Sequence, residues 1–143
     1  SFNNVKMLDN QNIVVNKDSS KIGLTFITDT YSERVAEKVL DSLTSQLSGV
    51  DFKIMITHQP NEKTRQAAVR NNYNLMLSGH THGGQVTLFF PFIGLTPTLF
   101  ETKYVKGDFW FGDLMMVVNG GLGMSLAPIR YNSTPEVTII TLD

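Results

Sequence analysis

Three histidines are the residues of this chain best suited to chemistry, and each follows a short apolar run. His58 follows Phe52–Thr57, whereas His80 and His82 follow Leu75–Leu77 within the sequence Ser-Gly-His-Thr-His-Gly-Gly-Gln. Imidazoles bind zinc, iron, nickel and manganese, and glycines permit the tight backbone angles that a ligating loop requires. A single histidine after a strand is more often a hydrogen-bonded loop residue than a ligand. Three in comparable positions favour a metal site.

The elements around the histidines predict that they meet at one edge of a sheet. Between the two apolar strands, Asn61 is a suitable N-cap for a helix that ends at Asn71. A strand, helix and second strand in this order place the two strands parallel and usually adjacent, so their carboxyl ends share an edge. Open α/β sheets bind ligands at that edge. We therefore expect all three imidazoles to line one crevice.

The remaining segments complete an α/β fold with a mixed sheet. Before the first histidine, apolar runs and turn residues predict strands at Val5–Leu8, Ile13–Val15 and Ile22–Ile27. A helix follows, with Ser32 as its predicted cap, Ser48-Gly49 as its end, and an apolar stripe of Val35, Ala36, Val39, Leu40, Leu43 and Leu47. After the last histidine we expect strands at Val86–Phe89, Tyr104–Val105, Leu114–Val118 and Val137–Leu142.

Composition narrows the function classes. The 143 residues suit one domain, and 41% hydrophobic with 17% charged residues indicates a globular chain. A formal net charge of −1 gives no electrostatic reason to expect nucleic acid as a partner. The absence of cysteine excludes disulfides, thiolate metal sites and a cysteine nucleophile. No run reaches the roughly 18 apolar residues of a transmembrane helix.

The motifs, taken in order, resemble those of the calcineurin-like metallophosphoesterases. The matching strings are Thr-His-Gln-Pro at 57–60, Leu-Ser-Gly-His-Thr-His-Gly-Gly-Gln at 77–85, Asn-Gly-Gly-Leu-Gly at 119–123, Pro-Ile-Arg at 128–130 and Pro-Glu-Val at 135–137. The likeness covers the chain from about Ile22 onward. It is greatest to a bacterial branch with the Gly-His-Thr-His-Gly-Gly-Gln signature, which includes membrane-associated phosphodiesterases and lipid-precursor pyrophosphatases.

The resemblance implies a fold, an activity and roles for the histidines. The fold would be a four-layer α/β/β/α sandwich, and the activity would be hydrolysis of a phosphodiester or pyrophosphate, with a lipid ester as one option. His58 and His80 would bind one divalent metal ion and His82 the other, the metals being manganese, iron, zinc, nickel or magnesium. A membrane surface would be a further partner of a membrane-associated relative.

The chain also departs from the family pattern. The family's Asp-x-His, Gly-Asp-x-x-Asp and Gly-Asn-His-Asp/Glu motifs do not occur, and Gly107–Phe111 lacks a second aspartate. A bridging carboxylate, an asparagine ligand and the histidine expected as general acid are therefore missing. We expect residues 1–143 to be the carboxyl-terminal half of such an enzyme, inactive alone and paired with an amino-terminal half or with a second copy in a homodimer.

Two alternatives to that hypothesis stay open. The chain could be a metal-binding or assembly module without catalytic competence. It could instead be a mononuclear zinc hydrolase that uses three histidines and a water molecule, which requires no other half. The number of metal ions bound per chain separates these alternatives.

Three further segments have two interpretations each. Residues 88–100 are unusually apolar, so they form either a buried loop over the sheet or an apolar lip that receives an acyl chain or a membrane surface. The run Gly120–Gly123 lacks the Lys-Ser/Thr of a phosphate loop, and we interpret it as a tight turn beside the site. Arg130 either contacts phosphate or, as we favour, has a structural role.

Overall fold

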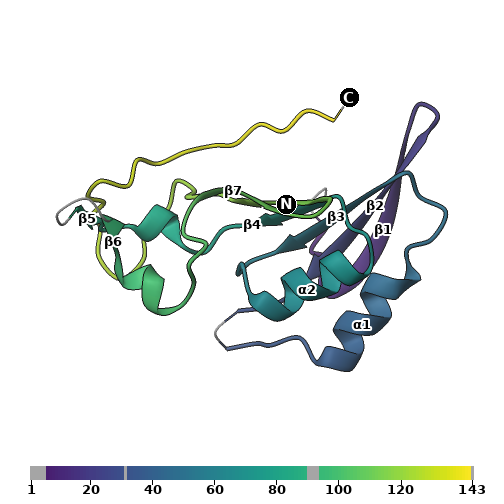
Figure 1. Cartoon of the computed structure of the whole chain (residues 1–143), viewed down its shortest axis with the longest axis horizontal. Helices are drawn as coiled ribbons and strands as arrows, with labels where there is room; N and C mark the ends of the chain where they lie inside the picture. Colours follow the sequence, from purple (N-terminus) through teal and green to yellow (C-terminus); the bar gives the residue numbers. More distant parts are fainter. Residues whose placement is uncertain (1–5, 31, 90–93, 143) are drawn as a thin grey trace.

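A six-stranded mixed sheet organises the chain, as the computed structural model shows for residues 6–30, 32–89 and 94–142 (Figure 1). The spatial order of its strands is β1-β2-β3-β4-β8-β7. Their bounds are Gln11–Lys17 for β1, Ser20–Ile27 for β2, Phe52–Thr57 for β3, Leu75–Ser78 for β4, Gly107–Phe111 for β7 and Leu114–Val118 for β8. The predicted α/β class with a mixed sheet is confirmed.

The central strands run parallel, and the outer ones run against them. β2, β3, β4 and β8 pair in parallel, whereas β1 is antiparallel to β2 and β7 is antiparallel to β8. Helix α2 (Glu62–Arg70) connects β3 to β4, and the Asn61 side chain caps it by accepting a hydrogen bond from the Thr64 N–H at 3.0 Å. The predicted strand–helix–strand unit and its cap are therefore confirmed.

Both helices pack on one face of the sheet and bury its main core. Helix α1 (Glu37–Gln46) and α2 lie on the same side in Figure 1. The core that they form with the sheet has these buried members: Ile27, Leu40, Leu47, Met55, Ala67, Ala68, Tyr73, Met76, Tyr104, Leu114, Met116 and Val118. Burial of this apolar area is the main force that fixes the strands, and thereby the loops that follow them.

The opposite face of the sheet is also apolar but less covered. Its buried members are Ile54, Leu75 and Val117, and six partly buried side chains surround them: Ile22, Leu24, Phe52, Ile56, Leu77 and Met115. In the described part of the chain, no residue of α1 or α2 belongs to this cluster. One sheet layer and one helix layer are thus seen of the four that the family resemblance implies.

The first helix begins later than its sequence predicts. Ser32 is not its cap: α1 starts at Glu37, after Ala36, whose side chain makes no capping hydrogen bond. The preceding segment is held in another conformation, because the Arg34 side chain donates to the buried carboxylate of Asp29 at 3.1 Å. A tertiary ion pair has therefore overridden a local capping signal.

Several predicted strands are shorter or absent. Two predicted strands, at residues 137–142 and at Tyr104–Val105, do not form. Of the strand predicted at Val5–Leu8, Met7 and Leu8 are not in a strand, and Val5 lies outside the described residues. The strand predicted at Val86–Phe89 is reduced to β5 (Leu88–Phe89), which pairs with β6 (Gly94–Leu95). Two short 3-10 helices, η1 (His82–Gly84) and η2 (Pro97–Phe100), accompany this small sheet. Within the described residues, neither α-helix is long and apolar enough to span a membrane.

Candidate metal centre

His58 and His80 meet at the carboxyl edge of the sheet. His58 directly follows β3, and His80 is the second residue after β4. A hydrogen bond from the Gly79 N–H to the His58 carbonyl, at 3.1 Å, joins the two loops. His58 Nε2 and His80 Nδ1 lie 3.1 Å apart, and the rings meet edge to face at 70° with centroids 4.9 Å apart. The parallel strands therefore bring together two of the three predicted ligands.

The spacing of these two nitrogens fits a shared metal ion. Metal–imidazole bonds are about 2.0–2.1 Å long, so two nitrogens at a tetrahedral angle on one ion lie about 3.3 Å apart. The separation of 3.1 Å between His58 Nε2 and His80 Nδ1 is close to that value. The same separation also allows one imidazole to donate a hydrogen bond to the other, which is the interaction available to the rings alone.

His82 has a contact partner of its own, apart from this pair. Its Nδ1 lies 3.1 Å from the carbonyl oxygen of Gly123. A carbonyl only accepts hydrogen bonds, so Nδ1 carries the proton and the lone pair of the neutral ring is on Nε2. His82 thus presents one nitrogen to the backbone and leaves the other for a ligand.

The three histidines do not converge on a single point. Among residues 6–30, 32–89 and 94–142, no three His, Asp or Glu side chains are grouped so that they could hold one metal ion together. A pair of imidazoles and a third, separately oriented imidazole are what the edge of the sheet offers. The assignment of His58, His80 and His82 as metal ligands stays a prediction.

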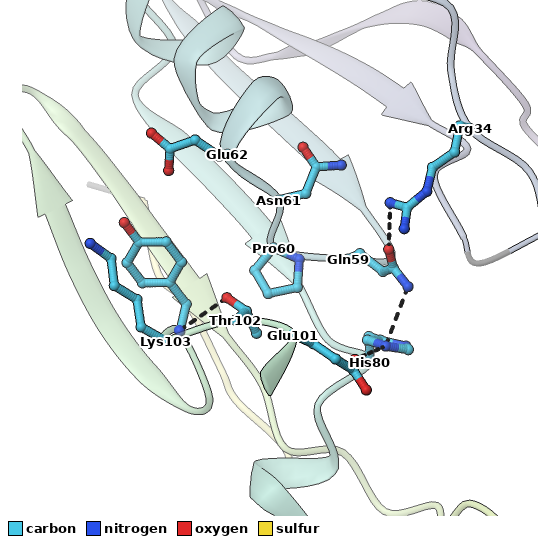
Figure 2. A pocket seen from close by; sticks show the side chains of 10 residues that line it. Arg34, Gln59, Pro60, Asn61, Glu62, His80, Glu101, Thr102 and Lys103 are labelled. Carbon is cyan, nitrogen blue, oxygen red and sulfur yellow. Dashed lines mark hydrogen bonds and ion pairs between the residues drawn. The ribbon is translucent and has the colours of Figure 1, made fainter. Parts of the chain in front are cut away.

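A series of polar contacts leads from Arg34 through Gln59 to His80 (Figure 2). Arg34 Nη1 donates to Gln59 Oε1 at 2.7 Å and to Asp29 Oδ1 at 3.1 Å, while Gln59 Nε2 lies 3.3 Å from His80 Nε2. Arginine can only donate, so Gln59 must direct its oxygen to Arg34 and its amide N–H groups to His80. Asp29, which is 2% exposed, also accepts from Asn61 and is thereby fixed.

Glu101 is the second partner of the same His80 nitrogen. Its Oε2 lies 3.2 Å from His80 Nε2. Gln59 donates to an unprotonated Nε2, whereas Glu101 requires a proton on Nε2, so the two contacts favour opposite tautomers. A cation between His58 and His80 would favour the second tautomer, because it needs the Nδ1 lone pair. Metal-binding histidines commonly donate their other N–H to a carboxylate in this way.

The environment also favours the neutral form of His58. Partial burial lowers the pKa of His58 below its ordinary value, and the positive charges of His80 and then His82 lower it further. A neutral imidazole is the form that binds metal ions. His58 is therefore ready for ligation at mildly acidic pH, where an unperturbed histidine would already be partly protonated.

Close backbone packing shapes the loop that carries His82. A Cβ atom built on Gly120 would lie 3.4 Å from the Cα of Gly83, so the two glycine runs pass in direct contact. Gln85 then holds the next loop, because its amide accepts from the Ser125 N–H at 2.7 Å and donates to the Ser125 and Ala127 carbonyls at 2.6 and 3.2 Å. Gly120–Gly123 therefore lies beside the site as predicted, but it has a bend at Leu122 rather than a hydrogen-bonded turn.

Two cavities open beside the histidines. One, of about 410 Å³, is lined mostly by polar and charged residues, among them His80, Glu101, Arg34 and Lys103, as Figure 2 shows. The other, of about 450 Å³, is lined by both His80 and His82 and by apolar side chains that include Val86, Pro97, Leu126 and Ile129. His80 and Glu101 line both cavities.

The segment at 88–100 is exposed where it is described. Leu88, Phe89 and Phe100 are 57%, 64% and 97% exposed, so the buried-loop interpretation is wrong for these residues. Phe90, Phe92 and Ile93 lie outside the described residues. Leu122, Met124, Leu126 and Ile129 are also exposed, on the loop that Gln85 holds. Of these exposed side chains, Leu126 and Ile129 line the second cavity.

Sequence reasoning missed the residues that support His80. Gln59 was next to a predicted ligand, and that adjacency was the one available signal. Arg34 and Glu101 are 46 and 21 positions from His80 in the chain, so no motif spacing could relate them to it. Their contribution depends on the loops before α1 and after η2 folding against the sheet edge.

Comparisons with known proteins give the class of this molecule. The chain is 37% identical over 129 residues to the uncharacterized metallophosphoesterase YkuE of Bacillus subtilis, covering 87% of the chain and 42% of that protein. It is 31% identical over 147 aligned residues to the uncharacterized metallophosphoesterase Cj0846 of Campylobacter jejuni, covering 97% and 35%. The chain belongs to the calcineurin-like metallophosphoesterase family.

A relative named for an activity extends this assignment. The phosphodiesterase YaeI of Escherichia coli is 36% identical over 91 residues, which cover 63% of the chain and 32% of that protein. The chain thus spans well under half the length of each of these relatives. No protein-family model matches the chain. No solved structure matches it.

Proposed function

We propose that the chain supplies the histidine-bearing part of a two-metal site that hydrolyses phosphoesters in the complete protein. The observation that carries this proposal is the pair of facing nitrogens, His58 Nε2 and His80 Nδ1, 3.1 Å apart at the carboxyl edge of a parallel sheet. Relatives named metallophosphoesterase and phosphodiesterase support the reaction class. On this proposal, residues 1–143 are the carboxyl-terminal half of the enzyme's domain, and the four-layer sandwich needs the other half.

The residues divide their roles as follows. His58 and His80 hold one ion between them, and His82 offers its unprotonated Nε2 to the second. Glu101 accepts the remaining N–H of His80 and keeps that ring oriented. Imidazole donors suit zinc, iron and nickel better than magnesium. Two bound divalent ions would supply an activated water and neutralise charge on the phosphoryl oxygens.

Metal content and hydrolysis of an activated diester test this proposal together. In the complete natural protein, manganese-dependent hydrolysis of bis(p-nitrophenyl) phosphate should fall by more than about a hundredfold in His80→Ala, since changes in outer-shell residues alone reach that value. Gln66→Ala, on the exposed side of α2, is the matched control and should retain activity. Two ions per protein support the proposal, one favours the mononuclear zinc hydrolase, and none favours the assembly module.

The chain alone should be a poor enzyme. It lacks a bridging carboxylate motif, and its described residues group no three ligands around one ion. We expect the purified 143-residue chain to show little turnover of the same diester. Rapid manganese-stimulated turnover that His80→Ala abolishes would contradict the half-site and favour a self-sufficient one.

We also propose that the substrate carries an acyl chain. The support is the cavity of about 450 Å³ that is lined by His80 and His82 and also by the apolar side chains of Val86, Pro97, Leu126 and Ile129. An acyl chain or the surface of a bilayer gains roughly 0.8 kcal/mol for each methylene group that it buries there. Two exposed side chains would contact the same apolar phase: Leu126, which lines the cavity, and Phe89, which lies three residues after Val86 of its wall.

Liposome binding distinguishes this substrate class from a soluble one. In the complete protein, Phe89→Ser with Leu126→Ser should weaken binding to phosphatidylcholine vesicles and leave hydrolysis of the soluble diester nearly unchanged. Val14→Ser is the control, because Val14 is 49% exposed on the β1–β2 hairpin, away from β5 (Figure 1). Unchanged vesicle binding, or an equal loss of both activities and of melting temperature, would contradict an acyl-binding cavity.

The uncovered sheet face defines the expected protein partner. Among the residues that the structure describes, no helix residue belongs to the cluster around Ile54, Leu75 and Val117, and more than half of each compared relative lies outside the matched region. We propose that the rest of the complete protein covers this face, and that the isolated chain covers it with a second copy. Sedimentation at tens of micromolar should show dimers that Leu24→Glu disperses, and a stable monomer would contradict this.

A further inference from the structure

Arg130 makes an unusual set of contacts beside His82. Its Nη1 donates to the His82 carbonyl at 2.9 Å and to the Ser133 carbonyl and hydroxyl, both at 3.3 Å. Its Nη2 donates to the carbonyls of Gly120, Gly121 and Gly123 at 2.8, 3.0 and 2.5 Å, and its Nε donates to Gly123 at 3.2 Å. One half-buried guanidinium thus donates to carbonyl oxygens of three segments: the His82 loop, the Gly120–Gly123 run and Ser133.

These contacts leave Arg130 no free nitrogen for substrate. A guanidinium has five N–H groups on three nitrogens, and here all three nitrogens donate to protein oxygens. The structural interpretation of Arg130 therefore holds, and direct contact with a phosphate does not. Its importance must lie in what it holds in place.

The Gly123 carbonyl is what links Arg130 to the chemistry of His82. This carbonyl accepts from Arg130 and also lies 3.1 Å from His82 Nδ1. The guanidinium therefore fixes the acceptor that selects the His82 tautomer, while it fixes the main chain of His82 through a second nitrogen. His82 itself has φ of 50°, so its backbone needs such outside support.

We propose that Arg130 is a positioning residue that sets the tautomer of His82. With Gly123 held in place, the neutral ring keeps its proton on Nδ1 and presents an unprotonated Nε2 to the site. The proposal rests on the proposed function only in taking His82 as a metal ligand, because the tautomer itself belongs to the metal-free protein. A lysine cannot replace the arginine, since an ammonium is a single point and cannot span the carbonyls of residues 82, 120 and 123.

The long-range ¹H–¹⁵N spectrum of the histidine rings tests this directly. In the 143-residue chain at pH 8 without metal, His82 should show a protonated Nδ1 and an unprotonated Nε2. Arg130→Lys should shift the ring toward a mixture of tautomers, with the Nε2–H form visibly populated. Arg70→Lys, at an exposed ion pair with Asp41 on the helical face, should leave the spectrum unchanged.

A second variant separates tautomer control from loop stability. Ser133→Ala removes hydroxyl hydrogen bonds to the carbonyls of His82 and Gly83, at 2.7 and 3.0 Å, but leaves the Arg130–Gly123 contacts. It should lower the melting temperature without changing the His82 tautomer. If Ser133→Ala changes the tautomer as much as Arg130→Lys, the arginine is only general support, and the proposal is overturned.

The remaining outcomes also decide the question. An Nε2–H tautomer in the unmodified chain overturns the proposal whatever the variants show. A folded Arg130→Lys or Arg130→Gln variant with an unchanged His82 spectrum overturns it too, and so does the loss of fold in both variants. Absence of phosphoesterase activity in the complete protein, with the tautomer shift as expected, would instead refute the proposed function and leave the role of Arg130 standing.

Discussion

Replacing Gly84 by alanine should destabilise the loop that carries His82 far more than an ordinary glycine substitution would. Gly84 has φ of +88°, a conformation that a residue with Cβ adopts only under strain of about 1–3 kcal/mol. A Cβ there would also lie 2.8 Å from the hydroxyl oxygens of Thr87 and Thr96 and 3.1 Å from the Thr96 Cβ. The Thr96 hydroxyl cannot simply turn away, because it donates to the Gly84 carbonyl at 2.6 Å.

Gly112→Ala is the matched control for this substitution. Gly112 also has a positive φ, +65°, but a Cβ there would meet no atom within 4 Å. In Gly112→Ala, the free energy of unfolding should therefore fall only by the backbone strain, about 1–2 kcal/mol. At Gly84, overpacking adds about 1–3 kcal/mol to the backbone strain, so the free energy of unfolding of Gly84→Ala should fall by about 2–6 kcal/mol in all.

Thermal unfolding followed by circular dichroism measures the difference. At about 4 °C for each kcal/mol in a chain of this size, Gly112→Ala should lower the melting temperature by about 4–8 °C and Gly84→Ala by about 8–24 °C. Equal shifts for the two variants would refute the reasoning, because they would mean that Thr87 and Thr96 yield without cost.

Three other predictions follow from buried or titrating groups. Burial raises the pKa of Tyr73, so the stability that its neutral phenol gives is complete below pH about 10 and is lost as the pH rises above it. Urea unfolding should show this alkaline loss of stability in the unmodified chain and not in Tyr73→Phe. Burial and the charges of His80 and His82 lower the pKa of His58, so its ring should stay neutral to a lower pH than an exposed histidine; an NMR titration in which His58 takes up its proton above pH about 6.5 would contradict this. Asp29→Asn removes a buried carboxylate that accepts hydrogen bonds from Arg34 and Asn61, and urea unfolding should show a loss of about 1–3 kcal/mol. Asp18→Asn on an exposed turn should change stability by less than about 0.5 kcal/mol, and equal effects would show that the Asp29 carboxylate contributes little.

The parallel centre of the fold could be predicted from sequence because its signals are local. The runs that became β3 and β4 are short, apolar and separated by a helix with a clear cap at Asn61. Handedness and short connections then leave few arrangements for a strand–helix–strand unit. The meeting of His58 and His80 follows from those rules without knowledge of any side-chain contact.

The edges of the fold could not be predicted in the same way. Apolar and polar side chains alternate along residues 137–142 as they do in a strand, but a strand needs a neighbouring strand, and the described part of the chain offers none. The start of this segment is instead held by Glu136, which accepts a hydrogen bond from the Gly120 N–H at 2.7 Å and forms an ion pair with Lys106. The α1 boundary depended on the pairing of Arg34 with Asp29. Both outcomes depend on tertiary contacts that no periodicity encodes.

The meeting of His58 and His80 could be predicted from sequence, whereas the residues that support them could not. The residue types and positions of His58 and His80 indicate a metal site, whereas Glu101 and Arg34 approach His80 through separate loops. The orientation of His82 toward Gly123 likewise depends on the packing of two glycine runs. Such contacts are set by the close approach of backbones, which spacing in the sequence does not reveal.

Anomalous diffraction from crystals of the complete protein grown with manganese tests the central claim most directly. We predict one anomalous peak within bonding distance of His58 Nε2 and His80 Nδ1, and a second bound by His82 Nε2. Glu101 should remain hydrogen-bonded to the other nitrogen of His80. Manganese bound only by groups away from these three histidines, or no peak at their nitrogens at saturating manganese, would contradict the account.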